Sequence, residues 1–297
     1  MNFIDFWNKG KFDTNKVLLS LTLVFFAYFV GSSILYIDLA FNFPDYEIIG
    51  NDYVKNLSLL LGKNRLLLWL LLPFIFVFAA LIGCLYKIHK LPLVAIFTSR
   101  EKIDWKRSYF AFSLWGVMVV GVTLIELLLH RDFEIIFNLQ RFLPLFFLAL
   151  LIVPIQTTTE ELLFRGYILQ GIKKRTGSYI TAILTSGVMF GMMHIANPEI
   201  LKMGYHILIY YVAVGVVLGF IVYYDSGLEL AMGFHAANNL ITALLITSDW
   251  QAFQTDAILK DNHPPGNGVT GILMASVMLC LFFYIVMKKY KWAIFSK

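Results

Sequence analysis

A succession of long apolar stretches constrains this chain more than any other feature of its sequence. A helix needs about 20 largely apolar residues to cross a bilayer. Eight such stretches follow one another, at 17–39, 66–87, 108–129, 143–171, 178–197, 203–224, 228–247 and 269–288. In hydrocarbon a segment must satisfy its own backbone hydrogen bonds, which favours helices over open strands. The pattern predicts an all-α, polytopic membrane protein with eight transmembrane helices and a single transmembrane domain over residues 1–297.

The composition leaves little polar surface for a water-soluble fold. Of 297 residues, 59% are hydrophobic and 14% are charged, and the mean hydropathy is +0.73. A globule of this size could not coat itself with so few polar groups. Membrane lipid is therefore the expected surrounding of most side chains.

The distribution of Lys and Arg predicts the orientation in the membrane. With eight spans, one face holds 16 of these residues and the other holds 7. Positively charged loops stay on the cytoplasmic side, so both termini are expected to be cytoplasmic. Basic loops beside anionic lipid account for the net charge of +5, and no nucleic-acid partner is expected.

The fourth stretch contains charged residues that need a reason to lie in a membrane, because each costs a few kcal/mol to insert. Glu160 and Glu161 are adjacent and Arg165 follows. Glu161 and Arg165, at i and i+4, share a helix face, whereas Glu160 points about 100° away. We expect Glu161 and Arg165 to form a supporting pair that leaves Glu160 free for chemistry. The alternative is an ordinary Glu–Arg pair at a helix end.

Two further polar motifs lie in the fifth and seventh stretches. His194 follows Phe190 by four residues, and His235 and Asn239 share a face at i, i+4. A lone histidine on an apolar helix is usually a hydrogen-bonded core residue, which is the alternative for each motif taken singly. Counted inward from the cytoplasmic ends, however, these residues and Glu160 reach a similar depth. They therefore predict one polar cavity among helices 4, 5 and 7, open toward the cytoplasm.

This set of side chains can hydrolyse an amide bond in two ways. Glu160 opposite a histidine can take a proton from water, while His235 and Asn239 stabilise an oxyanion. Alternatively, Glu160, His194 and His235 can hold a Zn²⁺ ion that activates its bound water. The histidine–carboxylate donor set suits zinc, whereas Asn239 suits the metal-free scheme, and the sequence leaves both open.

In their order along the chain, the three motifs Glu160-Glu161-x-x-x-Arg165, Phe190-x-x-x-His194 and His235-x-x-x-Asn239 resemble the signature motifs of the CPBP family. This family comprises CAAX proteases and bacteriocin-processing (Abi) enzymes and includes CAAX prenyl protease 2. The resemblance covers about 140–247, so the first three helices within 1–139 lie outside it. It implies an eight-helix intramembrane protease in which Glu160 and His194 activate water, His235 and Asn239 complete the site, and Glu161 and Arg165 support it.

The function expected from these observations is an intramembrane endopeptidase of a bacterial plasma membrane. Its partners would be lipid and a peptide or membrane-anchored protein cleaved near the cytoplasmic face. A non-catalytic binding or scaffold protein of the same fold, for example in bacteriocin immunity, is the main alternative. A proton-coupled transporter is a third, against which no inverted repeat is seen. Outside the motifs, Asp225 and Glu229 are expected only to cap a short cytoplasmic turn.

Overall fold

The computed structural model describes residues 3, 8–47, 52–129, 132–265 and 268–292. The helices within these ranges are α1 (Thr14–Asn42), α2 (Tyr53–Leu61), α3 (Lys63–Gly83), α4 (Trp105–Leu129), α5 (Leu139–Glu161), α6 (Leu169–Thr176), α7 (Tyr179–Met192), α8 (Pro198–Met203), α9 (Ile207–Asp225), α10 (Glu229–Leu245) and α11 (Val269–Lys289). Two π-helical segments, Cys84–Ile88 and Leu162–Ile168, extend α3 and α5, and Val94–Ile96 forms a 3₁₀ turn. The strands are β1 (Phe133–Ile135), β2 (Ile246–Thr247) and β3 (Leu259–Asp261).

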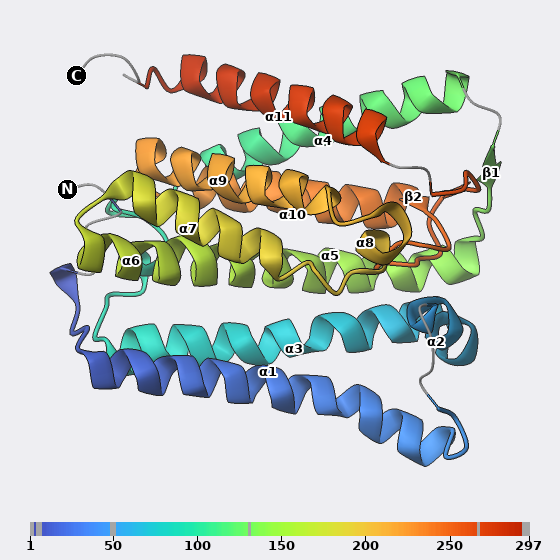
Figure 1. The fold of residues 1–297 in the computed structure, drawn as a ribbon, viewed down its shortest axis with the longest axis horizontal. Helices are drawn as coiled ribbons and strands as arrows, with labels where there is room; N and C mark the ends of the chain where they lie inside the picture. Colours follow the sequence, from blue (N-terminus) through green and yellow to red (C-terminus); the bar gives the residue numbers. More distant parts are fainter. Residues whose placement is uncertain (1–2, 4–7, 48–51, 130–131, 266–267, 293–297) are drawn as a thin grey trace.

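The long helices run side by side along one axis of the molecule (Figure 1). α1 packs on α3, α3 on α5, α5 on α10, and α10 on α4, while α7 packs on α9. α1 begins and α11 ends at the same end of the bundle (Figure 1). A chain that starts and ends on one side crosses the membrane an even number of times, as the predicted topology requires.

A helix occupies each of the eight predicted ranges, but not all of these helices are long. Six helical segments within the described residues have the length and apolarity to cross a bilayer. The helices at the other two positions are shorter, since α7 has 14 residues and α10 has 17. The count of eight crossings therefore stays a prediction.

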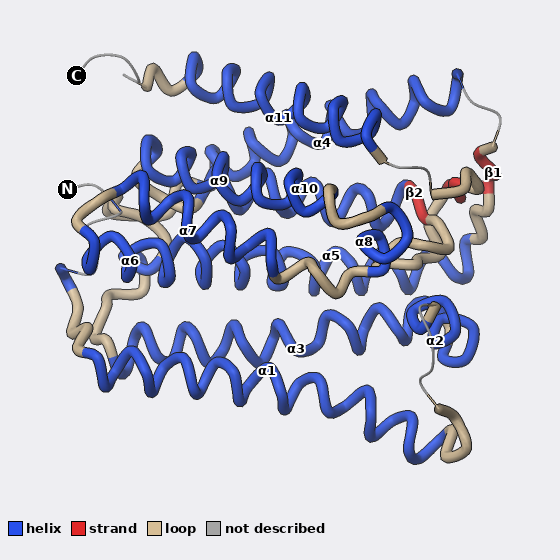
Figure 2. Tube along the Cα trace, viewed as in Figure 1, coloured by secondary structure: helices blue, strands red, loops and turns tan. Residues whose placement is uncertain are grey.

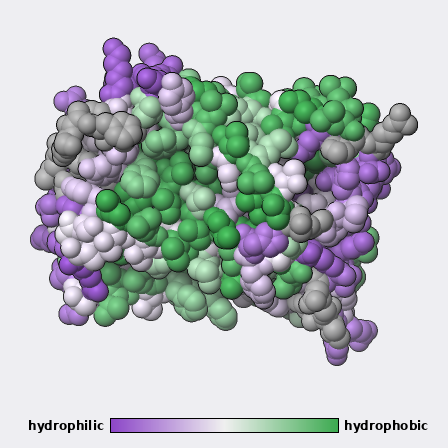
Figure 3. Space-filling model, turned by 45° about the horizontal axis from the view of Figure 1, so that its top comes forward, coloured by the Kyte–Doolittle hydropathy of each residue, from purple (hydrophilic) through white to green (hydrophobic). Residues whose placement is uncertain are grey.

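The face of the bundle seen in Figure 3 is largely apolar over its middle and carries most of its polar residues toward the two ends. Large side chains such as Phe25, Phe41 and Leu128 are 72%, 84% and 85% exposed. Exposing so many large apolar side chains to water would cost free energy, whereas contact with lipid tails does not. The chain is thus an integral membrane protein.

The prediction of a wholly helical chain was wrong in one part of the molecule. β1, β3 and β2 form a small sheet in that order, antiparallel between β1 and β3 and parallel between β3 and β2 (Figure 2). The sheet joins segments just before α5 and just after α10, at the end of the bundle where polar loops gather. Three short strands carry too little pattern to be distinguished from loop in the sequence.

α7 is shorter than the predicted span 178–197. It ends at Met192, and His194 lies in the turn that follows.

α7 and α9 approach each other closely at two glycine residues. A Cβ atom added to Gly215 would lie 2.6 Å from the Gly187 carbonyl oxygen, a distance that no side chain tolerates. Small residues that permit such backbone contact are a common device of membrane helices.

A buried charge cluster connects the end of α9 with the start of α10, where the sequence suggested only a turn. Arg100 contacts Asp225 at 3.1 Å and Glu229 at 3.0 Å, and Arg107 forms a second ion pair with Asp225. Both carboxylate side chains are fully buried. The cluster therefore fixes the first turn of α10, the helix that carries His235.

We expect Arg100→Ala to lower the free energy of unfolding by about 3 kcal/mol, because it leaves the carboxylate of Glu229 buried without its cation. Denaturant unfolding of the protein in detergent micelles measures the change. Lys16→Ala, which removes an exposed ion pair with Asp13, is the control and should leave stability nearly unchanged. Equal stability of the Arg100 variant and the wild type would show that the cluster does not hold α10.

Candidate active site

The two candidate carboxylates end α5 at a change in helical geometry. Glu160 and Glu161 are its last residues, and the π-helical segment Leu162–Ile168 continues the same helix to Thr176. The Leu169 N–H donates to the Phe164 carbonyl, which is the i→i+5 bond of a π-helix. Such single wide turns are frequent at functional sites, and this one contains Arg165.

Arg165 and Glu161 form the ion pair that their spacing predicted. Their side chains contact at 2.9 Å and are both completely buried. Arg165 also donates to the Gly215 carbonyl at 3.1 Å, and its guanidinium lies 4.3 Å from the centre of the Phe190 ring. The cation is thus held by an anion, a carbonyl dipole and an aromatic face, which replace part of the water it has lost, while its Nε–H has no hydrogen-bond partner among the described residues.

His235 is oriented by the same carboxylate. Its Nδ1 lies 2.8 Å from Oε1 of Glu161, the oxygen that also accepts from Arg165. An ionised carboxylate only accepts hydrogen bonds, so Nδ1 must carry a proton. The opposite nitrogen, Nε2, then faces Glu160, with 3.7 Å between Nε2 and Oε2. Glu161 therefore positions His235 as well as neutralising Arg165.

Glu160 is bound on its other side by an amide. Gln156 Nε2 donates to Oε1 of Glu160, and Asn239 Nδ2 donates to Oε1 of Gln156 at 3.1 Å. The structure thus brings Glu160, His235 and Asn239 into one cluster, with Gln156 between the first and the last. The Asn239 amide keeps a second N–H for another partner.

His194 joins this cluster through an aromatic ring. The Phe190 ring lies 5.0 Å from the His194 ring and 5.9 Å from the His235 ring, centre to centre. His194 Nδ1 donates to the Phe190 carbonyl at 2.9 Å, which leaves Nε2 without a proton on a neutral ring. Tyr211 stacks on the His194 ring at 4.2 Å with an interplanar angle of 16°.

The arrangement does not match the zinc site that the sequence left open. Within the described ranges, no three His, Cys, Asp or Glu side chains are gathered in a way that could hold one metal ion. His235 donates from one ring nitrogen to Glu161, as metal-bound histidines commonly do with a carboxylate, so this contact is compatible with either scheme. Metal dependence therefore stays a prediction to be tested.

Sequence reasoning missed two residues of the cluster. Gln156 precedes Glu160 by four residues, so the i, i+4 rule that paired Glu161 with Arg165 could have found it. Tyr211 lies on α9, which carries none of the three motifs, and no signal in the sequence connects it with His194.

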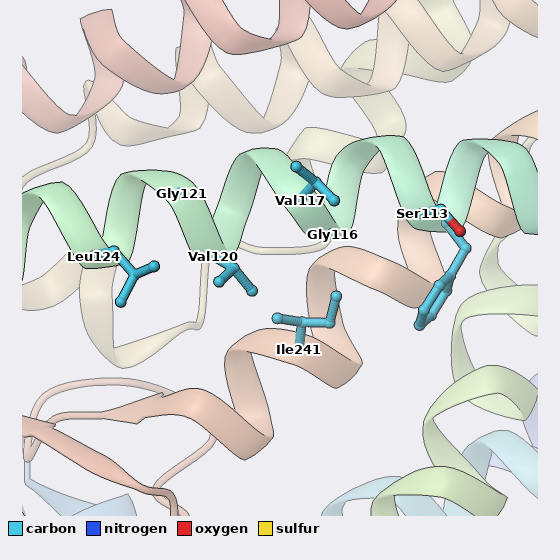
Figure 4. A pocket seen from close by; sticks show the side chains of 8 residues that line it. Ser113, Gly116, Val117, Val120, Gly121, Leu124 and Ile241 are labelled. Atoms are coloured by element: carbon cyan, nitrogen blue, oxygen red, sulfur yellow. The ribbon is translucent and has the colours of Figure 1, made fainter.

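An apolar hollow of about 490 Å³ lies between α4 and α10 (Figure 4). Its lining includes Gly116, Val117, Gly121 and Leu124 of α4 and Ile241 of α10. No candidate catalytic side chain lines this hollow.

Comparison with known proteins gives two findings. Residues 139–241 match the family model of the Rce1-like type II CAAX prenyl endopeptidases, which confirms the resemblance over this segment. The uncharacterized protein YyaK of Bacillus subtilis (strain 168) is 35% identical over 162 residues, or 54% of this chain and 54% of that protein. The chain thus spans about half the length of this curated relative. The matched segment resembles a protease family and contains Glu160, Glu161, Arg165, His194, His235 and Asn239.

Glu161→Gln should reduce stability at least as much as activity, because it leaves Arg165 buried without a counter-ion. We expect a loss of about 3–5 kcal/mol in the free energy of unfolding. Denaturant unfolding in micelles measures it, with Asp249→Asn, which breaks partly exposed pairs with Lys55 and Lys260, as the control. A Glu161 variant as stable as the wild type yet wholly inactive would instead give Glu161 a catalytic role.

Proposed function

We propose that this protein is an intramembrane endopeptidase that hydrolyses a peptide bond in a membrane-associated protein or peptide. The observation that carries the proposal is the position of Glu160, whose Oε2 lies 3.7 Å from His235 Nε2 inside an apolar bundle. A carboxylate and an imidazole so placed in a membrane are costly and suit general acid–base chemistry. The match of residues 139–241 to a protease family supports the same conclusion.

Glu160 is the general base in this scheme. Oε2 of Glu160 and Nε2 of a neutral His235 are both hydrogen-bond acceptors, so one water molecule can donate to each of them. Such a water presents an oxygen lone pair to a substrate carbonyl. As its oxygen bonds to the carbonyl carbon, one of its protons moves to Glu160, and the carbonyl oxygen becomes an oxyanion.

Breakdown of the tetrahedral intermediate returns this proton. The carbon–nitrogen bond breaks, Glu160 hands the proton to the leaving amine, and a new carboxylic acid remains on the other fragment, whose hydroxyl proton then passes to solvent to leave a carboxylate. Asn239 belongs to the cluster and keeps a second N–H beside the one that it donates to Gln156. This N–H can donate a hydrogen bond to the oxyanion. His194 supplies a second imidazole whose Nε2 can accept a proton. In this assignment His235, rather than His194, shares the water with Glu160, because His235 is the histidine that lies against Glu160.

The topology and location belong to the same proposal. We place both termini in the cytoplasm, in a bacterial plasma membrane, because the basic segments gather on that face in an eight-span arrangement. The substrate would then be cut near the cytoplasmic side. The substrate class is a peptide or a membrane-anchored protein, without commitment to a lipid modification.

Glu160→Ala should abolish cleavage, with a fall of about 10²–10⁴-fold in rate, because the base that takes the water proton is lost. The purified wild type and variant are incubated with a peptide library, and new termini are identified by mass spectrometry. Glu126→Gln, which changes a glutamate of α4 outside the cluster, is the control and should cleave like the wild type. Cleavage by a folded Glu160→Ala protein at the wild-type rate would refute the role of Glu160. If the folded wild type cleaves no peptide, the non-catalytic alternative is favoured.

We expect cleavage to persist after metal removal, because the described donors are not arranged around one ion. Elemental analysis of the purified protein is paired with the peptide assay after chelation and after zinc is added back. The metal-free scheme predicts full activity with less than about a tenth of an equivalent of transition metal. Loss of activity on chelation and its recovery with zinc would support the hypothesis that Glu160, His194 and His235 are zinc ligands.

A further inference from the structure

An unbroken chain of hydrogen bonds connects α4 with Glu160 through Asn239 of the third motif and two amides outside the motifs, Asn238 and Gln156. Trp115 Nε1 donates to Asn238 Oδ1, Asn238 Nδ2 donates to Asn239 Oδ1, and Asn239 Nδ2 donates to Gln156 Oε1, each at 3.1 Å. Gln156 Nε2 then donates to Oε1 of Glu160. These five residues are called the amide chain below.

The two ends of the amide chain give it a single direction. An indole N–H of Trp115 can only donate, and the carboxylate of Glu160 can only accept. Each of the three amides between them must therefore accept with its oxygen and donate with its nitrogen. If any one amide turned over, donor would face donor, or acceptor would face acceptor, on both of its sides. The orientation of all three amides is thus set by groups at the ends.

Packing fixes the donor end of the chain. Trp115 is 2% exposed, and its ring lies 4.3 Å from the ring of Phe234 and 5.7 Å from that of Phe282. Gln156, next to the acceptor end, is 4% exposed, and Asn238 and Asn239 between them are partly buried. Because access to water is reduced along the chain, the amides rely on one another for hydrogen bonds, and this raises the cost of disorder at any link.

We propose that Gln156 is a positioning residue for Glu160 and that Trp115 anchors it through Asn238 and Asn239. Gln156 holds Oε1 of Glu160, and this leaves Oε2 directed at His235. Without this donor, the carboxylate is free to rotate about its last bond and the spacing between Oε2 and Nε2 is lost. The inference rests on the proposed function in one respect, that Glu160 is the base.

Steady-state kinetics of two variants test the proposal. Gln156→Met keeps the length of the side chain but has no amide, and kcat should fall by about 10–100-fold with KM unchanged, because the base is misplaced while substrate contacts remain. Trp115→Phe keeps the aromatic packing but has no donor, and kcat should fall by about 3–10-fold, the effect of one hydrogen bond. Trp69→Phe is the matched control, since it removes an indole donor to Asp38 that lies outside the amide chain.

The double variant separates a connected chain from two independent effects. If Trp115 acts through Gln156, the Trp115→Phe change should cost nothing further once Gln156→Met is present. Multiplicative losses in the double variant, or a wild-type kcat in folded Gln156→Met, would overturn the proposal. The thermal midpoint of every variant is measured in micelles, so that loss of folding is not read as loss of positioning.

A second measurement needs no activity and thus distinguishes failure of this inference from failure of the proposed function. In the ¹⁵N-labelled protein, the indole N–H signal of Trp115 is the one that Trp115→Phe removes. Gln156→Met should shift this signal, although the two side chains are joined only through Asn238 and Asn239, and should leave the Trp69 signal unchanged. An unmoved Trp115 signal would show that the amide chain is not connected, whether or not any peptide is cleaved.

Discussion

The packing at the centre of this molecule depends on one buried cation, the guanidinium of Arg165. Arg165 is completely buried among apolar helices, and removing a guanidinium from water costs several kcal/mol unless other groups replace the hydration. Glu161, the Gly215 carbonyl and the Phe190 ring supply that replacement from three directions. Because those groups lie on α5, α9 and α7, satisfying one charge fixes the relative positions of three helices.

The arrangement of the candidate site follows from this requirement. Glu161 Oε1 serves Arg165 and His235 together, so the ion pair also determines where His235 points. His235 then faces Glu160, which is held from the other side by Gln156. The charge cluster of Arg100 with Asp225 and Glu229 fixes the beginning of α10. Because His235 lies on the same helix, the cluster also helps to place His235. Two buried sets of charges thus support one pair of reactive groups.

Sequence reasoning succeeded where the physical rule was local. Apolar length located a helix at each predicted span, and i, i+4 spacing identified the Glu161–Arg165 pair. It failed where a contact joins residues far apart in the chain. His235 is 74 residues from Glu161, and Arg100 is 129 residues from Glu229, so no window of sequence shows that these charges meet. The motif order placed the polar residues in one region, but only the packing shows that Nε2 of His235 lies 3.7 Å from Oε2 of Glu160.

The buried ion pair of Glu161 and Arg165 determines how His235 presents its ring nitrogens. Nitrogen NMR of the histidine side chains measures this directly, with signals assigned by His194→Gln and His235→Gln. The account predicts a proton on Nδ1 of both rings, since Nδ1 of His235 donates to Glu161 and Nδ1 of His194 donates to the Phe190 carbonyl. In Glu161→Gln the signal of His235 should change and that of His194 should remain. A proton on Nε2 alone in either wild-type ring would contradict the account.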